Sequence, residues 1–269
     1  MRKSNPFLVV LLVVVLVWTL LPFLYLLLAS LTAGSFLPRG LALPSEVTLD
    51  NYRNALFTES IGPQLLNSLL VAGVTTVIVL VFSIPAAYGF ARLKARTAGF
   101  VFYLLLVVRM IPDITFTVPT YFFVKDLGLL GSRFSLCLIY AFWQVPFSIW
   151  LLRPFFELIP YELEEAALLD GASQLGVLRR VIFHLLGPVL AVVFIFTFQA
   201  CYIEYLFASL LTSIDTMTLP VRLAQYSSMH KLYWGPMSAA VTISLIPMIF
   251  IYVFGQKYIV RGLTLGAIK

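Results

Sequence analysis

The chain has 269 residues, of which 61% are hydrophobic and only 11% are charged, and its mean hydropathy is +0.99. Because soluble domains carry about 25% charged residues, this composition excludes an ordinary water-soluble domain and predicts an all-α protein that crosses a membrane several times. The net charge of +6 is interpreted as a signal of membrane topology, so nucleic-acid binding is not indicated.

A membrane-spanning helix needs about 20 apolar residues, and six stretches of the sequence meet that requirement. The first follows Arg2 and Lys3, as the apolar core of a signal peptide would, but its run from Phe7 to Ala29 is longer than the usual ~7–15 residues. We therefore expect it to be a retained anchor. In chain order the predicted spans are 7–31, 66–91, 100–123, 134–152, 185–211 and 236–256.

The spans divide the chain into three predicted blocks. Residues 1–62 form the first membrane helix and an outer loop, residues 63–256 form a core of five membrane helices, and residues 257–269 form a basic tail. If the N-terminus lies inside, most Lys and Arg side chains fall in the inner segments. This bias predicts cytoplasmic N- and C-termini and places the polar segment 157–183 on the cytoplasmic side.

The usual signatures of catalysis and nucleotide binding are absent from the sequence. The dipeptide Gly-Lys of a phosphate-binding P-loop never occurs, and neither do the H-E-x-x-H, C-x-x-C and G-x-S-x-G patterns. Cys137 and Cys201 lie in predicted spans, where small buried side chains are the simpler interpretation. We therefore expect no enzyme activity, no metal site and no cofactor bound by this chain.

An acidic helical hairpin is predicted between the fourth and fifth spans, over residues 160–183. It follows Glu157 and carries Glu162, Glu164, Glu165 and Asp170, so this short segment holds a large share of the chain's 12 carboxylates. Acidic side chains are favourable in the first turns of a helix. A helix that rests on anionic lipid is normally basic, so the hairpin is predicted to bind a soluble partner, with an interfacial helix as the alternative.

Turn-forming residues define the hairpin's ends. Pro160 suits the first position of a helix, and the small Ala166 and Ala167 allow another surface to come close. Gly171 suits the left-handed position that ends a helix. Ser173 then suits the cap of a second helix.

Polar side chains inside membrane spans are rare and often functional. Arg109 and Asp113 are four residues apart, so they are expected to share a helix face with Thr117 and to pair across Pro112. An internal salt bridge that contacts no substrate is the alternative.

Further polar side chains fall near the middle of the fourth and fifth spans, namely Gln144, Gln199 and Glu204, with Tyr202 and Tyr205 beside the last. If the third to fifth spans enclose a cavity, amides, carboxylates and aromatic faces suit a sugar. The alternatives are hydrogen bonds between helices for the amides and packing for the tyrosines.

The hairpin resembles the EAA loop of ABC-importer permeases, through Glu165-Ala166-Ala167, Gly171 and the later Val181-Ile182-Phe183-His184. Val181, Phe183 and His184 stand where that family has Ile, Leu and Pro. The resemblance extends to Asn67–Leu69 and Ala86–Arg92. Matches at Pro146–Arg153 and Val260–Ala267 resemble the carbohydrate-type, maltose-like type I branch.

The resemblance implies a type I ABC importer permease fold in the bacterial cytoplasmic (inner) membrane. It also implies four kinds of partner: a second permease subunit, two ATP-binding cassette subunits that hold the ATP, an extracytoplasmic substrate-binding protein, and the lipid bilayer. The cargo would be a sugar, oligosaccharide or polyol. The implied contacts to the ATPase are Glu162, Glu164, Glu165, Ala166, Ala167, Asp170 and Gly171. The expected substrate pathway comprises Arg109, Asp113, Thr117, Gln144, Gln199, Tyr202 and Glu204.

Two other classes of function stay open from the sequence. The first is a secondary transporter driven by an ion gradient, with Asp113 or Glu204 as the titrating group. The second is a membrane scaffold that transports nothing.

Overall fold

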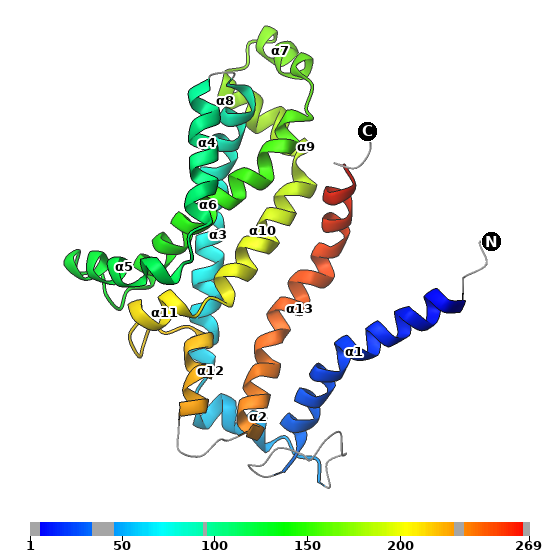
Figure 1. Cartoon of the computed structure of the whole chain (residues 1–269), viewed down its shortest axis with the longest axis vertical. Coiled ribbons are helices and arrows are strands. Elements are labelled where there is room, and N and C mark those ends of the chain that lie inside the picture. The colour runs from blue at the N-terminus through cyan, green and yellow to red at the C-terminus, as the bar shows by residue number, and fades with distance from the viewer. Residues whose placement is uncertain (1–5, 34–45, 94–95, 229–233, 266–269) are drawn as a thin grey trace. The chain divides into compact units, whose positions relative to one another are not determined.

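A computed structural model describes residues 6–33, 46–93, 96–228 and 234–265 of the chain. Within these ranges the backbone is helical apart from turns and one isolated β-bridge between Thr32 and Val47, as Figure 1 shows. The all-α prediction is confirmed.

Four helices in the described residues are long and apolar enough to cross a membrane. Two further pairs of helices pass the same test only together, because each pair is sharply bent. The predicted number of six spans therefore holds if each bent pair counts as one span. The four helices are α1 (Pro6–Leu31), α3 (Gly62–Arg92), α6 (Arg133–Glu157) and the Trp234–Ile259 part of α13 (Trp234–Leu265).

The third predicted span, 100–123, is not one continuous helix. It consists of α4 (Arg96–Arg109) and α5 (Ile114–Asp126), which are bent by 98°. Pro112 lies in the break; it has no N–H to donate, and it disfavours helical backbone in the residue before it. Because of this bend, the expectation that residues 109, 113 and 117 share one helix face is wrong.

The fifth predicted span, 185–211, is bent at its first residues and broken again after Tyr202. An 84° bend separates the segment Gln174–Leu185 from α10 (Gly187–Tyr202), and Pro188 lies just inside α10, where a helix tolerates it. The helix then ends at Tyr202, and a separate short helix, α11 (Leu206–Leu211), follows. The sequence reveals the second break only through Glu204, whose carboxylate accepts hydrogen bonds from the start of α11.

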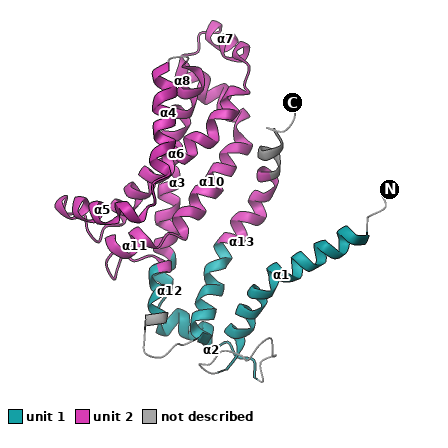
Figure 2. Cartoon of the chain, in the orientation of Figure 1, with its two compact units in different colours: residues 1–65, 221–247 teal, residues 66–220, 248–269 magenta. Residues whose placement is uncertain are grey.

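Two compact units make up the chain (Figure 2). Unit 1 contains residues 1–65 and 221–247, and unit 2 contains residues 66–220 and 248–269. The predicted blocks at 1–62, 63–256 and 257–269 are defined by position relative to the membrane, and they stay a prediction. The helix α13 continues through the first part of the predicted tail, to Leu265.

Unit 1 is held together by buried polar side chains around Asn51. This residue lies in α2 (Asp50–Arg53), which continues into the π-helical turn η1 (Asn54–Thr58). The Asn51 amide donates to the carbonyl oxygens of Ser30 (3.0 Å) and Thr32 (2.9 Å) at the end of α1. A Cβ on Gly235 would lie 2.6 Å from the Asn51 amide oxygen, so close approach of the α13 backbone requires glycine there.

Unit 2 is built around α6, against which both α4 and α10 pack. Its apolar core includes Leu152, Phe156, Ile182 and Val193, each with no exposed surface. At one end the chain leaves α6 and forms α7 (Tyr161–Leu169), which projects beyond the neighbouring helices in Figure 1. The return runs through α8 (Gln174–Val177), η2 (Leu178–Ile182) and α9 (Phe183–Leu185).

Polar side chains of α3 tie a second loop into unit 2. The Asn67 amide donates to the carbonyl oxygens of Asp215 and Met217, both at 3.0 Å. The Ser68 hydroxyl accepts from the backbone N–H of Leu219 at 2.8 Å, where α12 (Leu219–Ser228) begins. These bonds satisfy buried polar groups and fix the loop after α11 against the start of α3.

Candidate functional site

The predicted helical hairpin is present, with its turn at Gly171. The helix α7 begins at Tyr161, with Pro160 as its N-cap, so it begins one residue later than predicted. Gly171 has φ of +85°, and the backbone N–H groups of Gly171 and Ala172 donate to the carbonyl oxygens of Leu168 and Ala167, both at 3.0 Å. This geometry ends a helix with a left-handed residue. Ser173 then caps α8 as predicted, since its hydroxyl accepts from the N–H of Gly176 at 3.2 Å.

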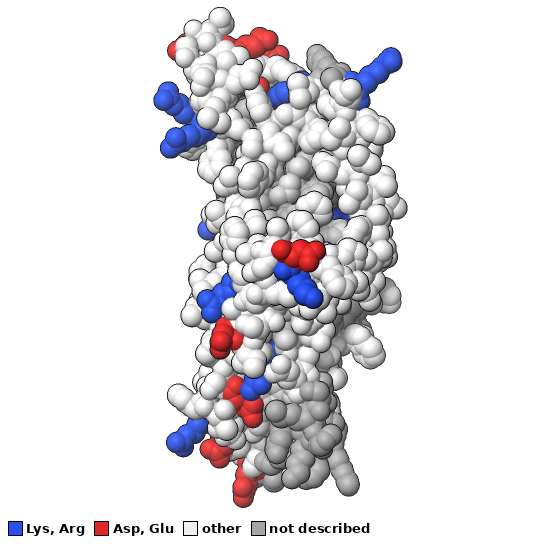
Figure 3. Space-filling model, turned by 90° about the vertical axis from the view of Figure 1, so that its left-hand side faces the viewer, with Lys and Arg blue, Asp and Glu red and all other residues white. Residues whose placement is uncertain are grey.

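The hairpin presents a mixed acidic and apolar surface. Glu162, Glu165 and Asp170 are exposed, and Figure 3 shows acidic side chains gathered at the end that carries α7. Leu169 is 88% exposed and Leu175 is 72% exposed. Of the predicted contact residues, Ala166 is exposed and Ala167 is partly buried. Carboxylates beside large exposed aliphatic side chains are the chemistry of a protein-docking surface.

Glu164 differs from the other acidic residues because it is buried. Its carboxylate accepts from the Arg92 guanidinium (Nε to Oε1, 2.8 Å) and from the Tyr88 hydroxyl (2.8 Å), both on α3. It therefore faces into unit 2, away from any docking surface. The sequence held one signal for this arrangement: Tyr88 and Arg92 are four residues apart, so they share a helix face.

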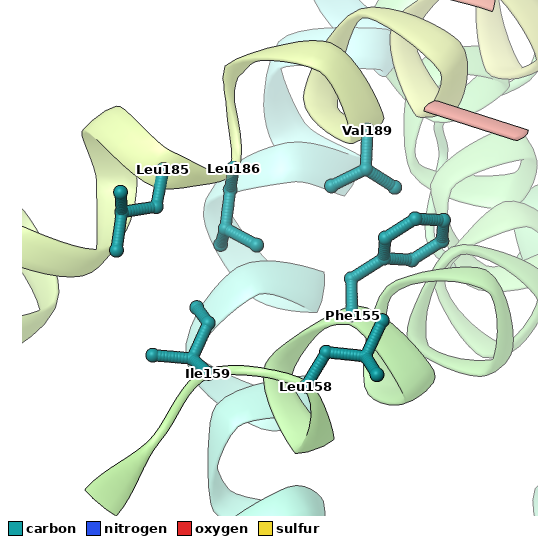
Figure 4. A pocket seen from close by; sticks show the side chains of 6 residues that line it. All are labelled: Phe155, Leu158, Ile159, Leu185, Leu186 and Val189. Carbon is teal, nitrogen blue, oxygen red and sulfur yellow. The ribbon is translucent and has the colours of Figure 1, made fainter. Parts of the chain in front are cut away.

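An apolar cleft lies at the base of the hairpin. Its volume is about 300 Å³, and Figure 4 shows the aliphatic and aromatic side chains around it. One wall comes from the end of α6 and the turn after it, and the other comes from the bend between α9 and α10. The side chains are Phe155, Leu158, Ile159, Leu185, Leu186 and Val189.

Several predicted pathway residues come together inside unit 2. Arg109, Asp113, Gln144 and Glu204 all line one small cavity of about 30 Å³. A second cavity of about 360 Å³ also includes Arg109 and Gln144, and adds Gln199. The aromatic side chains of Phe147 and Phe196, which the sequence did not single out, line this larger cavity.

The charged members of this cluster already have partners. Arg109 and Asp113 are 3.6 Å apart (Nη1 to Oδ1). The Glu204 carboxylate accepts from the backbone N–H groups of Phe207 (2.8 Å) and Ala208 (3.1 Å), and from the Tyr140 hydroxyl. Glu204, which is partly buried, therefore caps α11, and these groups satisfy its carboxylate with hydrogen bonds.

The two amides differ in accessibility. Gln144 is 9% exposed and lines both cavities. Gln199 is only partly buried. It accepts a hydrogen bond from the Tyr252 hydroxyl of α13, and it lines the larger cavity but not the smaller one. The remaining two predicted pathway residues lie elsewhere: the Thr117 hydroxyl bonds to the carbonyl oxygen of Ile114 at 2.7 Å, and Tyr202 is buried and stacked on Phe198.

Residues 80–265 match the family described as the inner membrane component of binding-protein-dependent transport systems. The chain belongs to this family. The permease is similar to a trehalose/maltose transport system permease protein of Thermococcus litoralis, with 31% identity over 254 residues, covering 93% of this chain and 91% of the relative.

Two other relatives are similarly close. A trehalose transport system permease protein of Mycobacterium tuberculosis is 34% identical over 255 residues, covering 94% of the permease and 93% of the relative. A probable ABC transporter permease protein of Bacillus subtilis is 34% identical over 229 residues, covering 85% of the permease and 76% of the relative. The predicted membership among ABC importer permeases is confirmed, and the permease is a multi-pass membrane protein.

The fold is that of a known transporter subunit. A chain in the crystal structure of a bacterial ABC transporter involved in the import of the acidic polysaccharide alginate superimposes with a TM-score of 0.81. The match covers 96% of the permease and 98% of that chain, at 24% sequence identity. The predicted fold class is therefore confirmed over nearly the whole chain.

Proposed function

We propose that the permease forms half of the translocation pathway of an ATP-driven importer for a sugar, oligosaccharide or polyol. A second permease subunit would form the other half, an extracytoplasmic binding protein would deliver the cargo, and two ATPase subunits would bind and hydrolyse the ATP. The permease itself would then hold no cofactor. Relatives named for trehalose and maltose transport support the cargo class.

The hairpin is the observation that carries the coupling role. In this proposal its exposed surface, with Leu169, Leu175 and the carboxylates of Glu162, Glu165 and Asp170, binds the ATPase subunit. An aliphatic side chain that is 88% exposed and lies beyond the helical bundle has neither core nor lipid to cover it. The hairpin would lie in the cytoplasm, as would both termini, in the bacterial inner membrane.

The larger cavity is proposed as part of the substrate pathway. Its volume of about 360 Å³ falls within the usual ~300–1,000 Å³ of ligand sites. Gln144, Gln199 and Arg109 would bind hydroxyl groups, and Phe147 and Phe196 would contact the C–H faces of a sugar ring. Closure of the ATPase dimer would move the hairpin and expose this cavity to alternate sides of the membrane.

Transport driven by an ion gradient is a poorer fit to the geometry. That mechanism needs a carboxylate free to bind and release an ion, whereas Glu204 accepts three hydrogen bonds and Asp113 is paired with Arg109.

Uptake by the complete transporter in sealed proteoliposomes tests the proposal. Labelled trehalose, labelled maltose and a labelled polyol are each offered with the binding protein, with ATP inside or absent, and with or without an ionophore. We expect uptake that requires ATP and ignores the ionophore. Uptake that persists without ATP and collapses with the ionophore would contradict the proposal, and so would an intact complex that moves neither sugar nor polyol.

A further inference from the structure

Arg92, the last residue of α3, connects that membrane helix to the hairpin. Its Nε donates to Glu164 Oε1 at 2.8 Å, and its Nη2 donates to the carbonyl oxygen of Ile159 at 3.0 Å. The guanidinium also lies 4.3 Å from the ring centroid of Tyr161. One side chain thus contacts the turn before α7, the first residue of α7 and its buried carboxylate.

The second oxygen of Glu164 is also bound to α3. The Tyr88 hydroxyl, one helical turn before Arg92, donates to Oε2 at 2.8 Å, and the Tyr88 ring packs on Phe156 at 5.7 Å between centroids. Both carboxylate oxygens are therefore held by the same helix at two successive turns. Attachment at two points prevents α7 from rotating about a single hydrogen bond.

Burial strengthens the connection between Arg92 and Glu164. The Arg92 and Glu164 side chains are only 11% and 8% exposed. Charge-assisted hydrogen bonds are strong where water is excluded, and a planar guanidinium fixes both partners in orientation. Separation of the pair would leave an uncompensated buried charge, which strongly disfavours any movement of α7 that leaves α3 behind.

The second arm of the hairpin is attached differently. Val177, Leu178 and Ile182 of this arm are buried in the apolar core of unit 2. Beside them, Leu185 lines the apolar cleft of about 300 Å³ at the end of α6 (Figure 4). Dispersion and hydrophobic contacts are not directional. The first arm is thus held by directional hydrogen bonds, while the second arm is held by apolar packing beside an open cleft.

We propose that Arg92 is a positioning residue that makes α3 and the α7 arm move as one body, so that force on the hairpin reaches the membrane helices through Glu164. This inference rests on the proposed function. It assigns Glu164, the predicted ATPase contact, to a connection inside the permease. The exposed Glu162, Glu165 and Asp170 are left for the partner surface.

The test compares ATP hydrolysis with uptake in the complete, reconstituted transporter. Loss of Arg92 alone would leave Glu164 buried without its partner, so the main variant is the double substitution Arg92→Met with Glu164→Gln. Arg92→Lys retains the charge but not the fork that reaches both Glu164 and Ile159. The matched control is Glu157→Gln, which makes the same change as Glu164→Gln. Glu157 pairs with Arg153 within one helix, and this pair is exposed.

We expect the double variant to assemble with its ATPase and to hydrolyse ATP, while sugar taken up per ATP falls about tenfold or more, in the range of typical coupling between sites. Arg92→Lys should give an intermediate ratio, and Glu157→Gln should match the parent chain. An unchanged ratio in the double variant would overturn the proposal. So would loss of ATPase binding, because the pair would then serve only to fold the docking surface. Failure of the parent transporter to couple uptake to ATP would instead contradict the proposed function.

Discussion

The turn at Gly171 gives the sharpest prediction about the hairpin. Its φ of +85° lies in the left-handed region, and a Cβ built there has nothing within 4 Å. Substitutions therefore meet no steric obstacle within the described structure, and their cost comes from the backbone alone. Left-handed backbone costs an ordinary residue about 1–2 kcal/mol, Asn less, and a β-branched residue most.

A penalty of this size reduces the population of the native turn about 5- to 30-fold relative to its alternatives. We expect Gly171→Val to remain in the membrane and to lose most ATP-dependent uptake, Gly171→Ala to be intermediate, and Gly171→Asn to retain most activity. The assay is initial uptake in proteoliposomes, normalised to the assembled complex. Full uptake by Gly171→Val would refute the reasoning. If Gly171→Asn and Gly171→Val were equally inactive, the close approach of a partner, and not backbone strain, would be the reason for glycine at position 171.

Three more predictions follow from single contacts. Ser173→Ala removes the cap of α8, which is worth about 1 kcal/mol, so amide hydrogen exchange in the first turn of α8 should quicken about fivefold; unchanged exchange would show that the cap is dispensable. Gly255→Val should lower the thermal stability of the detergent-purified protein by about 1–3 kcal/mol, because a Cβ on residue 255 would lie 2.3 Å from Ile195 Cδ1. Adding Ile195→Ala to this variant should restore part of the lost stability. Gln144→Ala removes a hydrogen-bonding group from both cavities, so the KM for sugar should rise about 3- to 10-fold. Thr117→Ser should leave this KM unchanged. A KM that changes in Thr117→Ser but not in Gln144→Ala would place the pathway elsewhere.

Features that depend on local sequence could be predicted. Gly171 and Ser173 define the hairpin turn through backbone preference and capping, which act over a few residues. The apolar stretches likewise predicted where the membrane helices lie, because burial in lipid requires a continuous run. The remaining errors concern where an apolar run is interrupted. Pro112 carried a clear signal for a break. Glu204 breaks its span by capping α11, and this depends on which backbone N–H groups its partly buried carboxylate reaches.

Features that depend on pairing between distant segments could not be predicted. Glu164 looked like its exposed neighbours, and only the fold brings it against Tyr88 and Arg92, more than seventy residues earlier in the chain. Arg92 in turn looked like one of the basic residues that flank a membrane span. The grouping of the pathway residues shows the same limit: Gln144 lines both cavities, but Thr117 lies beyond the 98° bend. The pathway itself stays a prediction.

The account depends on an ATPase subunit that binds the hairpin, and crosslinking tests this most directly. A cysteine at Leu169, which is 88% exposed, is compared with one at Met110, which is 81% exposed at the break between α4 and α5. Both are made with the two native cysteines replaced, in the intact transporter. We predict that Leu169→Cys crosslinks to the ATPase subunit and that Met110→Cys does not. A Leu169→Cys thiol that never reaches the ATPase, or that reacts with an impermeant reagent from outside sealed cells, would contradict the account.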